Sequence, residues 1–272
     1  MSKIIIEADS TEQRYWRDLW LYRELFYVLA WRDIAVRYKQ TAIGVAWAII
    51  QPLTTMVIFT VIFHRIAKMG SNDIPYMLVV GAGTLPWNFF SAALSGSSQS
   101  LVGNANLISK VYFPRLIVPA AAIVTACVDF LISFGLIVCV MAWYHYLPTW
   151  RILFLPLFAG VAFLAALGPG LLITALNVKY RDFRYIIPFL LTFGTYVSPV
   201  GFSSSHVPEN WRLLYSLNPM VGVIDSFRWA LLADGSSFSL PRSLLSLAVI
   251  VAFLIIGIWY FRKTERTFAD VI

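Results

Sequence analysis

The sequence holds few side chains whose type and spacing could carry out a reaction. No lysine follows a glycine anywhere in the chain, so the Gly-Lys pair that ends a phosphate-binding loop is absent. The three histidines, His64, His145 and His206, are far apart in the sequence, and none is accompanied by the set of further ligands that a metal site needs. We therefore expect no catalytic residue, no metal site and no cofactor in this chain.

One ionisable residue stands apart, because Asp129 interrupts an otherwise uncharged apolar stretch at residues 116–144. A carboxylate at membrane depth is a candidate functional group. A proton relay or an intramembrane enzyme needs a second ionisable group beside it, and the apolar stretches supply none. Two interpretations remain open: a functional carboxylate, or a carboxylate that bonds to hydroxyls or to an arginine of a neighbouring helix. We favour the second, in which it holds helices together.

The composition excludes a water-soluble domain. Only 13% of the 272 residues are charged and 59% are hydrophobic, with a mean hydropathy of +0.73, whereas soluble domains carry about 25% charged residues. The apolar residues form six stretches that are each long enough to cross a bilayer. This is the pattern of an all-α membrane protein with six transmembrane helices. The net charge of +7 comes from bases at the ends of these stretches, so we expect no nucleic acid partner.

The six expected spans are interrupted in two places by residues that disfavour a straight helix. The stretch SGSSQS (95–100) followed by GNAN (103–106) is polar, so the second span is expected to end within it, near residue 98. Gly168-Pro169-Gly170 is expected to break the fourth span. The expected spans are residues 40–63, 75–98, 116–144, 152–177, 185–202 and 243–261.

Six crossings place both termini on the same side of the membrane, and the distribution of basic residues indicates which side this is. Fifteen of the 21 Lys and Arg residues fall on the side of the termini. Because cytoplasmic loops carry the excess of Lys and Arg, we expect a multi-pass protein of the bacterial inner membrane with both termini in the cytoplasm. The first 14 residues do not read as a cleaved signal peptide.

Two further segments are apolar but are not expected to cross. Residues 15–39 alternate aromatic and charged side chains, which predicts an amphipathic helix in the interface plane, with Leu19, Tyr22, Phe26 and Leu29 on its apolar face. Residues 207–235 contain an uncharged run that is too short to span, which predicts a re-entrant outer helical hairpin turning at Asn218 and Pro219.

This order of elements, with four motifs, resembles the transmembrane subunit of ABC-2 type exporters, in particular the branch that moves O-antigen, teichoic acid or capsule. The motifs lie in the same order as in that family and together cover most of the chain, which would form one transmembrane domain over residues 1–272. They are RYKQTAIGVAWAIIQPL (37–53), NLISKVYFPRLIVP (106–119), LNVKYRDFRYIIP (176–188) and LNPMVGVIDSFRWALL (217–232).

The resemblance implies a homodimer joined to two copies of a separate cytoplasmic ABC ATPase, which would bind the ATP and Mg²⁺. It also implies that residues 103–114 form a coupling helix that docks on that ATPase. The apolar members of this segment have helical spacing and lie among bases, which suits docking in a groove. The expected coupling residues are Leu107, Ile108, Lys110, Val111, Tyr112 and Arg115.

The resemblance also implies a polyprenyl-diphosphate-linked polysaccharide as substrate, together with contacts to membrane lipid. Aromatic rings can stack on sugars while the polymer slides past, and weak binding of this kind favours conduction. The aromatic candidates in the first, second and fifth spans are Trp47, Trp87, Phe89, Phe90, Phe193 and Tyr196. Helix packing and membrane anchoring remain the alternative role for each of them.

Charged residues at the two ends of the path supply the last candidates. Arg37 and Lys39, expected at the inner mouth of the first span, suit the substrate diphosphate, although positive-inside topology alone would also explain them. In the outer hairpin, Asp225 and Arg228 are three residues apart and could pair with each other or across the dimer axis, which would anchor a gate together with the Asn218-Pro219 turn. A solvated interface face would also explain this charged pair.

Two other classes of function remain open. The chain could export teichoic acid, capsule or a small lipid-like molecule by the same architecture. It could also be a membrane scaffold or enzyme without any transport role.

Overall fold

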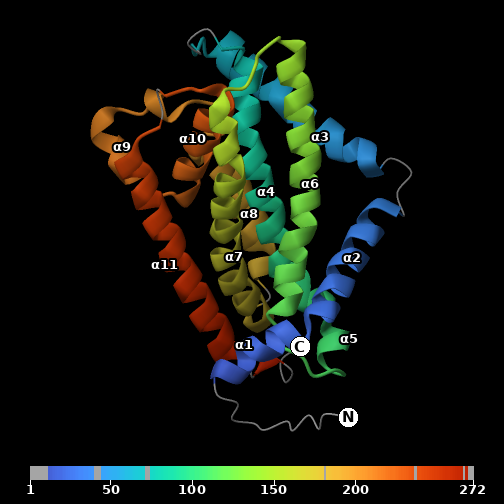
Figure 1. Ribbon diagram of the computed structural model, residues 1–272. Coiled ribbons are helices and arrows are strands. Elements are labelled where there is room, and N and C mark those ends of the chain that lie inside the picture. The colour runs from blue at the N-terminus through green and yellow to red at the C-terminus, as the bar shows by residue number, and fades with distance from the viewer. Residues whose placement is uncertain are drawn as a thin grey trace.

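The computed structural model of the protein describes residues 12–39, 44–70, 74–180, 182–235, 238–265 and 267–268. All regular structure in these residues is helical (Figure 1), which confirms the all-α class. Short helices of other types cover Thr60–Ile66, Trp150–Phe154 and Ser204–His206. The α-helices are α1 (Glu12–Leu21), α2 (Arg23–Lys39), α3 (Gly44–Phe59), α4 (Tyr76–Gly103), α5 (Ala105–Ile108), α6 (Ile117–Trp143), α7 (Leu155–Lys179), α8 (Phe183–Val197), α9 (Glu209–Tyr215), α10 (Pro219–Leu232) and α11 (Leu240–Glu265).

Five segments of the described chain, rather than the expected six, are long and apolar enough to cross a membrane as helices. The first is α3 continued by the π-helix, from Ala46 to Ile66, and the others are α4, α6, α11 and α7 with the turn before it. The expected span 185–202 is instead α8, a helix of 15 residues. At 1.5 Å per residue α8 is about 22 Å long, which is less than a bilayer core.

The early end of α8 has a local cause. Proline disfavours helical geometry in the residue before it, and Ser198, which precedes Pro199, has an extended backbone with ψ of 154°. Residues 198–203 then continue as non-helical chain packed inside the bundle, with Val200 buried.

By contrast, α4 runs past the polar residues at which the second span was expected to end. Its serines have partners on the neighbouring helix, since Thr174 of α7 donates to the Ser97 carbonyl at 2.8 Å and Asn177 donates to the Ser98 carbonyl at 2.8 Å. The Ser100 hydroxyl bonds back to the Ser97 carbonyl. The polar stretch therefore joins α4 to α7 and is not a loop.

The Gly168-Pro169-Gly170 sequence does not break α7. Its glycine serves a close helix crossing instead, because a Cβ on Gly168 would lie 2.6 Å from the backbone nitrogen of Leu254 in α11. Gly257 of α11 faces Gly168 in the same way. The backbones of α7 and α11 touch here, and no side chain would fit between them.

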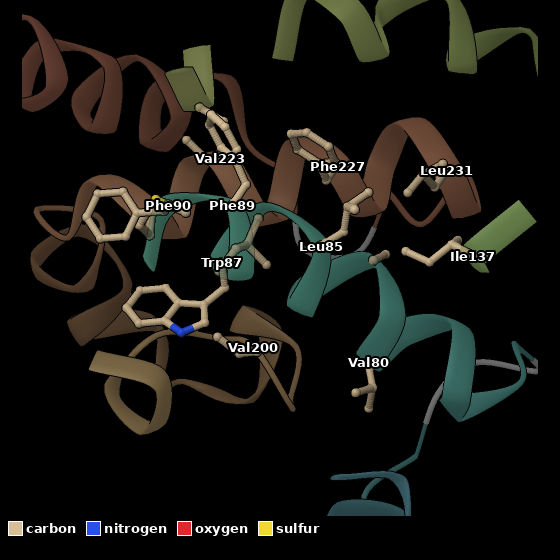
Figure 2. Packing of buried hydrophobic residues seen from close by; sticks show 14 of the residues in the cluster. Val80, Leu85, Trp87, Phe89, Phe90, Ile137, Val200, Val223, Phe227 and Leu231 are labelled. Carbon is tan, nitrogen blue, oxygen red and sulfur yellow. The ribbon is translucent and has the colours of Figure 1, made fainter. Parts of the chain in front are cut away.

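Buried residues form two clusters, one towards each end of the bundle. We call the end where α1 and Glu265 lie the lower end, as drawn in Figure 1, and the opposite end the upper end. The upper cluster joins α4, α6, α7 and α10, and Figure 2 shows part of it, including Leu85, Ile137 and Phe227. The lower cluster joins α2, α4, α6, α7 and α11 around Leu101, Ile108 and Phe261.

The expected interface helix over residues 15–39 is two helices that meet at Tyr22. Leu29 is buried in the lower cluster, and Leu19, Tyr22 and Phe26 pack against it, so the predicted apolar face covers protein rather than lipid. In Figure 1, α2 leaves the lower end at a slant and rises beside α6.

The predicted outer hairpin is a helix–turn–helix made of α9 and α10. Asn218 caps α10 by accepting a hydrogen bond from the Met220 amide at 3.0 Å, and Pro219 occupies the first turn, where a missing N–H is harmless. Twelve of the 14 residues of α10 are buried against α4, α7 and α11. The second arm of the hairpin is therefore packed inside the upper half of the bundle and does not lie across its surface.

Candidate functional site

The candidate site is a cavity of about 700 Å³ lined by α2, α3, α4, α6 and α8, a volume in the range of small-molecule pockets. Apolar residues, including Phe89, Phe130 and Leu191, form part of its wall. The rest of the wall is polar, and most of its polar groups are uncharged amides and hydroxyls. They are Gln51, Asn88, Ser91, Ser95, Ser133 and Thr192.

An ion pair lies in the wall of this cavity. The Arg37 guanidinium of α2 is 2.7 Å from Oδ2 of Asp129, while the Tyr38 hydroxyl donates to Oδ1 of the same carboxylate. Both oxygens of Asp129 are thus engaged by consecutive residues of α2. Asp129 is the arginine-bound carboxylate of the second interpretation, and it fastens the end of α2 to α6.

The pair lies at the middle of α6. Asp129 is midway along this helix, so Arg37 contacts α6 near its centre. A charge at this depth is stable only when it is paired or faces a water-filled cavity, and Arg37 meets both conditions. Its side chain remains 49% exposed, against 20% for Asp129. The side chain of Lys39 lies outside the described residues.

The six aromatic candidates divide into three pairs. Trp47 is exposed and lines the cavity, where Phe89 also contributes. Trp87 and Phe90 are buried and serve packing: Nε1 of Trp87 donates to Thr195 of α8 at 2.8 Å, and a Cβ on Gly194 would lie 2.6 Å from the Trp87 ring.

Phe193 and Tyr196 belong to an exposed aromatic stripe on α8. The stripe comprises Tyr185, Phe189, Phe193 and Tyr196, spaced four, four and three residues apart on one helix face. The rings of Phe189 and Phe193 are stacked at 6.4 Å with an interplanar angle of 10°. On the opposite face, Ile187 and Leu191 are buried in the upper cluster. α8 is therefore apolar on both faces, and the residues that the structure describes cover only one of them.

The expected coupling helix is shorter than predicted. Only Ala105–Ile108 is helical, and residues 109–116 follow as turns, because Pro114 and the buried Phe113 fix the chain close to the bundle. Ile108 is buried and Leu107 packs against the lower cluster. Lys110, Val111 and Tyr112 are exposed, whereas Arg115 is held by the last turn of α11.

The charged residues of the outer hairpin do not pair as a salt bridge. Arg228 is fully buried and donates to three backbone carbonyls: Val79 at 3.2 Å, Phe202 at 2.7 Å and Val200 at 3.0 Å. Asp225 accepts from Ser204 at 2.6 Å through Oδ2, and Oδ1 has no donor among the described residues. Burial raises the pKa of Asp225 to about 6, against the opposing effects of Ser204 and Arg228.

The polar residues of the cavity wall are the functional candidates that sequence reasoning missed. Tyr38 stands beside a named candidate, and Gln51, Asn88 and Ser133 each interrupt an apolar span. Isolated amides and hydroxyls within spans were the available signal. Their convergence on one cavity depends on helix rotation, which periodicity did not determine here.

A sequence profile of the ABC-2 type transporter family matches residues 24–232. The O-antigen export system permease protein RfbA of Klebsiella pneumoniae is 27% identical over 253 residues, which cover 92% of this chain and 95% of that protein. RfbA of Myxococcus xanthus is 28% identical over 214 residues, or 78% of this chain and 82% of that protein. The polysialic acid transport protein KpsM of Escherichia coli is 23% identical over 236 residues, or 86% and 91%.

Proposed function

This chain belongs to the ABC-2 type transporter family, and we propose that it is the membrane subunit of an ATP-driven exporter that moves a lipid-linked polysaccharide of the O-antigen class across the inner membrane. The cavity of about 700 Å³, with the Arg37–Asp129 pair in its wall, is the observation that links this function to particular residues. The relatives named for O-antigen export, which align over most of this chain, supply the class of substrate.

The pair suits a diphosphate because Arg37 is held but not buried. Its guanidinium is half-exposed and contacts Oδ2 of Asp129, so a phosphate approaching through the cavity meets a planar donor fork. The diphosphate of the lipid carrier competes with Asp129 for Arg37. The amides and hydroxyls of Gln51, Asn88 and Ser91 then offer hydrogen bonds to the first sugars.

The exposed stripe on α8 supports a channel between two copies of the chain. Four aromatic rings on one helix face are costly to leave in water but can stack on sugar rings along a path. We place this face towards the second copy in a homodimer, so that Phe193 and Tyr196 of each chain line the route. Trp87 and Phe90, being buried, hold α8 in place without touching the substrate.

The lower end of the bundle faces the cytoplasm in this proposal, and both termini with it. The exposed Lys110, Val111 and Tyr112 form the surface that contacts a separate ABC ATPase, while the buried Ile108 anchors this segment to the bundle. This chain contributes no catalytic group to ATP hydrolysis.

At the upper end, α10 is the fixed arm of the outer gate and α9 the free one. Arg228 binds α10 to three carbonyls of its surroundings, and the Asn218 cap sets the angle of the turn. Trp211, Leu213 and Leu214 of α9 are exposed and cover the outer mouth when no polymer is present.

Replacement of Arg37 tests this proposal in a strain that supplies the partner ATPase. Arg37→Lys keeps the charge but loses the planar fork, so surface glycan is expected to fall by about threefold or more, and Arg37→Gln further. The matched control is Arg23→Lys at the start of the same helix, where the guanidinium lies over Trp20; it should export normally. Surface glycan is compared at equal permease abundance.

Full export by Arg37→Lys would contradict a role in diphosphate binding and leave topology as the sufficient explanation. Absence of glycan export by the wild-type chain with its ATPase would contradict the proposed function as a whole.

A further inference from the structure

The lower end of the bundle contains a polar cluster that is separate from the cavity. Glu265, the last residue of α11, uses both carboxylate oxygens: Oε2 accepts from the Tyr15 hydroxyl at 2.9 Å and Oε1 accepts from the Arg115 backbone N–H at 2.7 Å. The Arg115 guanidinium also donates to the backbone carbonyl of Glu265. We call this set, Tyr15, Arg115 and Glu265, the clasp.

The clasp joins three segments that are far apart in the sequence. Tyr15 lies in α1, Arg115 ends the turn segment that follows α5, and Glu265 ends the last span. Through the side chain of Glu265, the clasp forms a direct polar bridge from α1 to the turn segment. The lower cluster, which includes Phe113 and Phe268, packs beneath it.

The surroundings make the clasp hard to replace with water. The guanidinium carbon of Arg262 lies 4.5 Å from the centre of the Tyr15 ring and covers it. Burial, together with the nearby Glu265 carboxylate, raises the pKa of Tyr15, so the phenol remains a proton donor throughout the physiological range. If the Glu265 carboxylate loses the hydrogen bonds from Tyr15 and Arg115, water cannot easily replace them, because the site is largely buried.

The position of the clasp gives it a mechanical consequence. Val111 and Tyr112, the exposed residues assigned to the ATPase contact, precede Arg115 by four and three residues, and Pro114 stiffens the chain between them. A displacement of this exposed surface therefore moves the backbone N–H of Arg115, and with it the carboxylate of Glu265 and the end of α11.

We propose that Glu265 is a positioning residue that transmits the movement of the 109–116 segment to α11 and α1. The inference rests on the proposed function, because it presumes that an ATPase acts on this segment. It goes further by naming the residue through which that action reaches the membrane helices, and by predicting that ATP hydrolysis and export separate when the clasp is broken.

The test uses the permease–ATPase complex in membranes and measures both ATP hydrolysis and glycan export. Glu265→Gln removes the charge, and Tyr15→Phe removes one hydrogen bond while keeping the ring under Arg262. Both variants should lower the glycan exported per ATP hydrolysed by about fivefold or more, since one lost hydrogen bond to a charged group alters an equilibrium by roughly this factor or more. The amount of assembled complex should remain that of the wild type.

Lys263→Gln is the matched control, two residues away on the same helix and exposed beside Trp259; its export per ATP should equal that of the wild type. Because Tyr15→Phe changes one atom, it remains informative if Glu265→Gln fails to fold. The double variant Tyr15→Phe with Glu265→Gln should be little worse than either single variant, since both break one linkage.

The outcomes separate the two levels of the proposal. Normal export per ATP in both single variants would overturn the clasp as a transmitting element. Equal losses of complex, hydrolysis and export would also overturn it, in favour of a role in folding alone. If the wild-type complex itself exports no glycan, the proposed function fails, whatever the variants do.

Discussion

Arg37 and Arg228 carry the same charge but differ in burial and in their partners. Arg37 sits at the end of a slanting helix, 49% exposed, with a carboxylate partner. Arg228 is fully buried and makes no ion pair among the described residues, its donors being taken by the carbonyls of Val79, Val200 and Phe202. One guanidinium is accessible to a ligand, and the other is part of the framework.

The difference shows that the partners of an arginine decide its role. The three carbonyls that accept from Arg228 supply no full negative charge, and two of them belong to the non-helical 198–203 segment, which has no helical donors for them. Arg37 is paired with Asp129 and lines the cavity. The sequence position of each arginine, at a helix end or inside a hairpin, does not reveal this.

The largest expected effect is the loss of the buried arginine. Arg228→Leu removes the donor to the carbonyls of Val79, Val200 and Phe202, of which the last two lie outside any helix. It is expected to lower the free energy of unfolding by about 3 kcal/mol or more. Gly83→Ala should act in the same direction, because its Cβ would lie 2.3 Å from the Val200 carbonyl oxygen and 2.7 Å from Nη2 of Arg228. Thermal unfolding of the purified protein in detergent measures both.

Gly96→Ala is the control in the same helix, since its Cβ would meet nothing closer than 3.8 Å. If Gly83→Ala and Gly96→Ala unfold at the same temperature, the contact between Arg228 and the 198–203 segment does not have the importance assigned to it.

The buried carboxylate next to Arg228 predicts an intermediate effect with a defined pH dependence. The folded pKa of Asp225, about 6, lies above the unfolded value of about 3.9, so the folded protein binds the additional proton between these values. The contribution of this group to stability is therefore fully present below pH 4 and is lost as the pH rises through 6, by on the order of 3 kcal/mol. Asp225→Asn should remove this dependence and raise stability at neutral pH.

Unfolding temperatures between pH 4 and pH 8 measure the effect. The control is Glu209→Gln, which changes an exposed carboxylate on α9 of the same hairpin. A wild-type protein whose stability rises with pH over this range would show that Asp225 is ionised at low pH and is not penalised by burial.

The smallest change in stability is expected at the exposed arginine. Asp129→Asn removes the ion pair but keeps an acceptor for Tyr38, and should cost about 1 kcal/mol or less because Arg37 is half-exposed. Substrate binding should improve, since Arg37 no longer needs to leave a carboxylate, and half-maximal stimulation of ATP hydrolysis should require about threefold less lipid-linked glycan.

Asp33→Asn supplies the comparison on the same helix, as it breaks the exposed pair with Arg32 at 2.7 Å and should leave substrate stimulation unchanged. A higher substrate requirement in Asp129→Asn would mean that Asp129 orients Arg37 for the substrate and does not compete with it.

The sequence predicted the long apolar helices well, because hydropathy alone sets them: α6 lies within one residue of its expected bounds at each end. It failed where polar residues are satisfied by a neighbour. From the sequence alone, the serines of α4 predict a loop. In the structure they are helical, and Thr174 and Asn177 of α7 donate hydrogen bonds to their carbonyls. The periodicity of α4 does not reveal these partners on another helix.

The site was predictable in its residue types but not in its assembly. Arg37 and Asp129 were both recognised as candidates, yet their pairing requires the slant of α2 against α6, which depends on packing at the lower cluster. Similarly, Asp225 and Arg228 have the spacing of a helical salt bridge, but the 198–203 segment takes the donors of Arg228.

The backbones of Gly168 and Gly257 touch, so α11 is held against α7 at this point and can pivot about it. Gly257 is eight residues from Glu265 and 17 residues from Leu240, so at 1.5 Å per residue the two arms are about 12 Å and 26 Å long. Figure 1 shows the long arm diverging from α7 towards the upper end. A rigid α11 turning at this point would roughly double, at the upper end of the helix, any lateral step applied at Glu265.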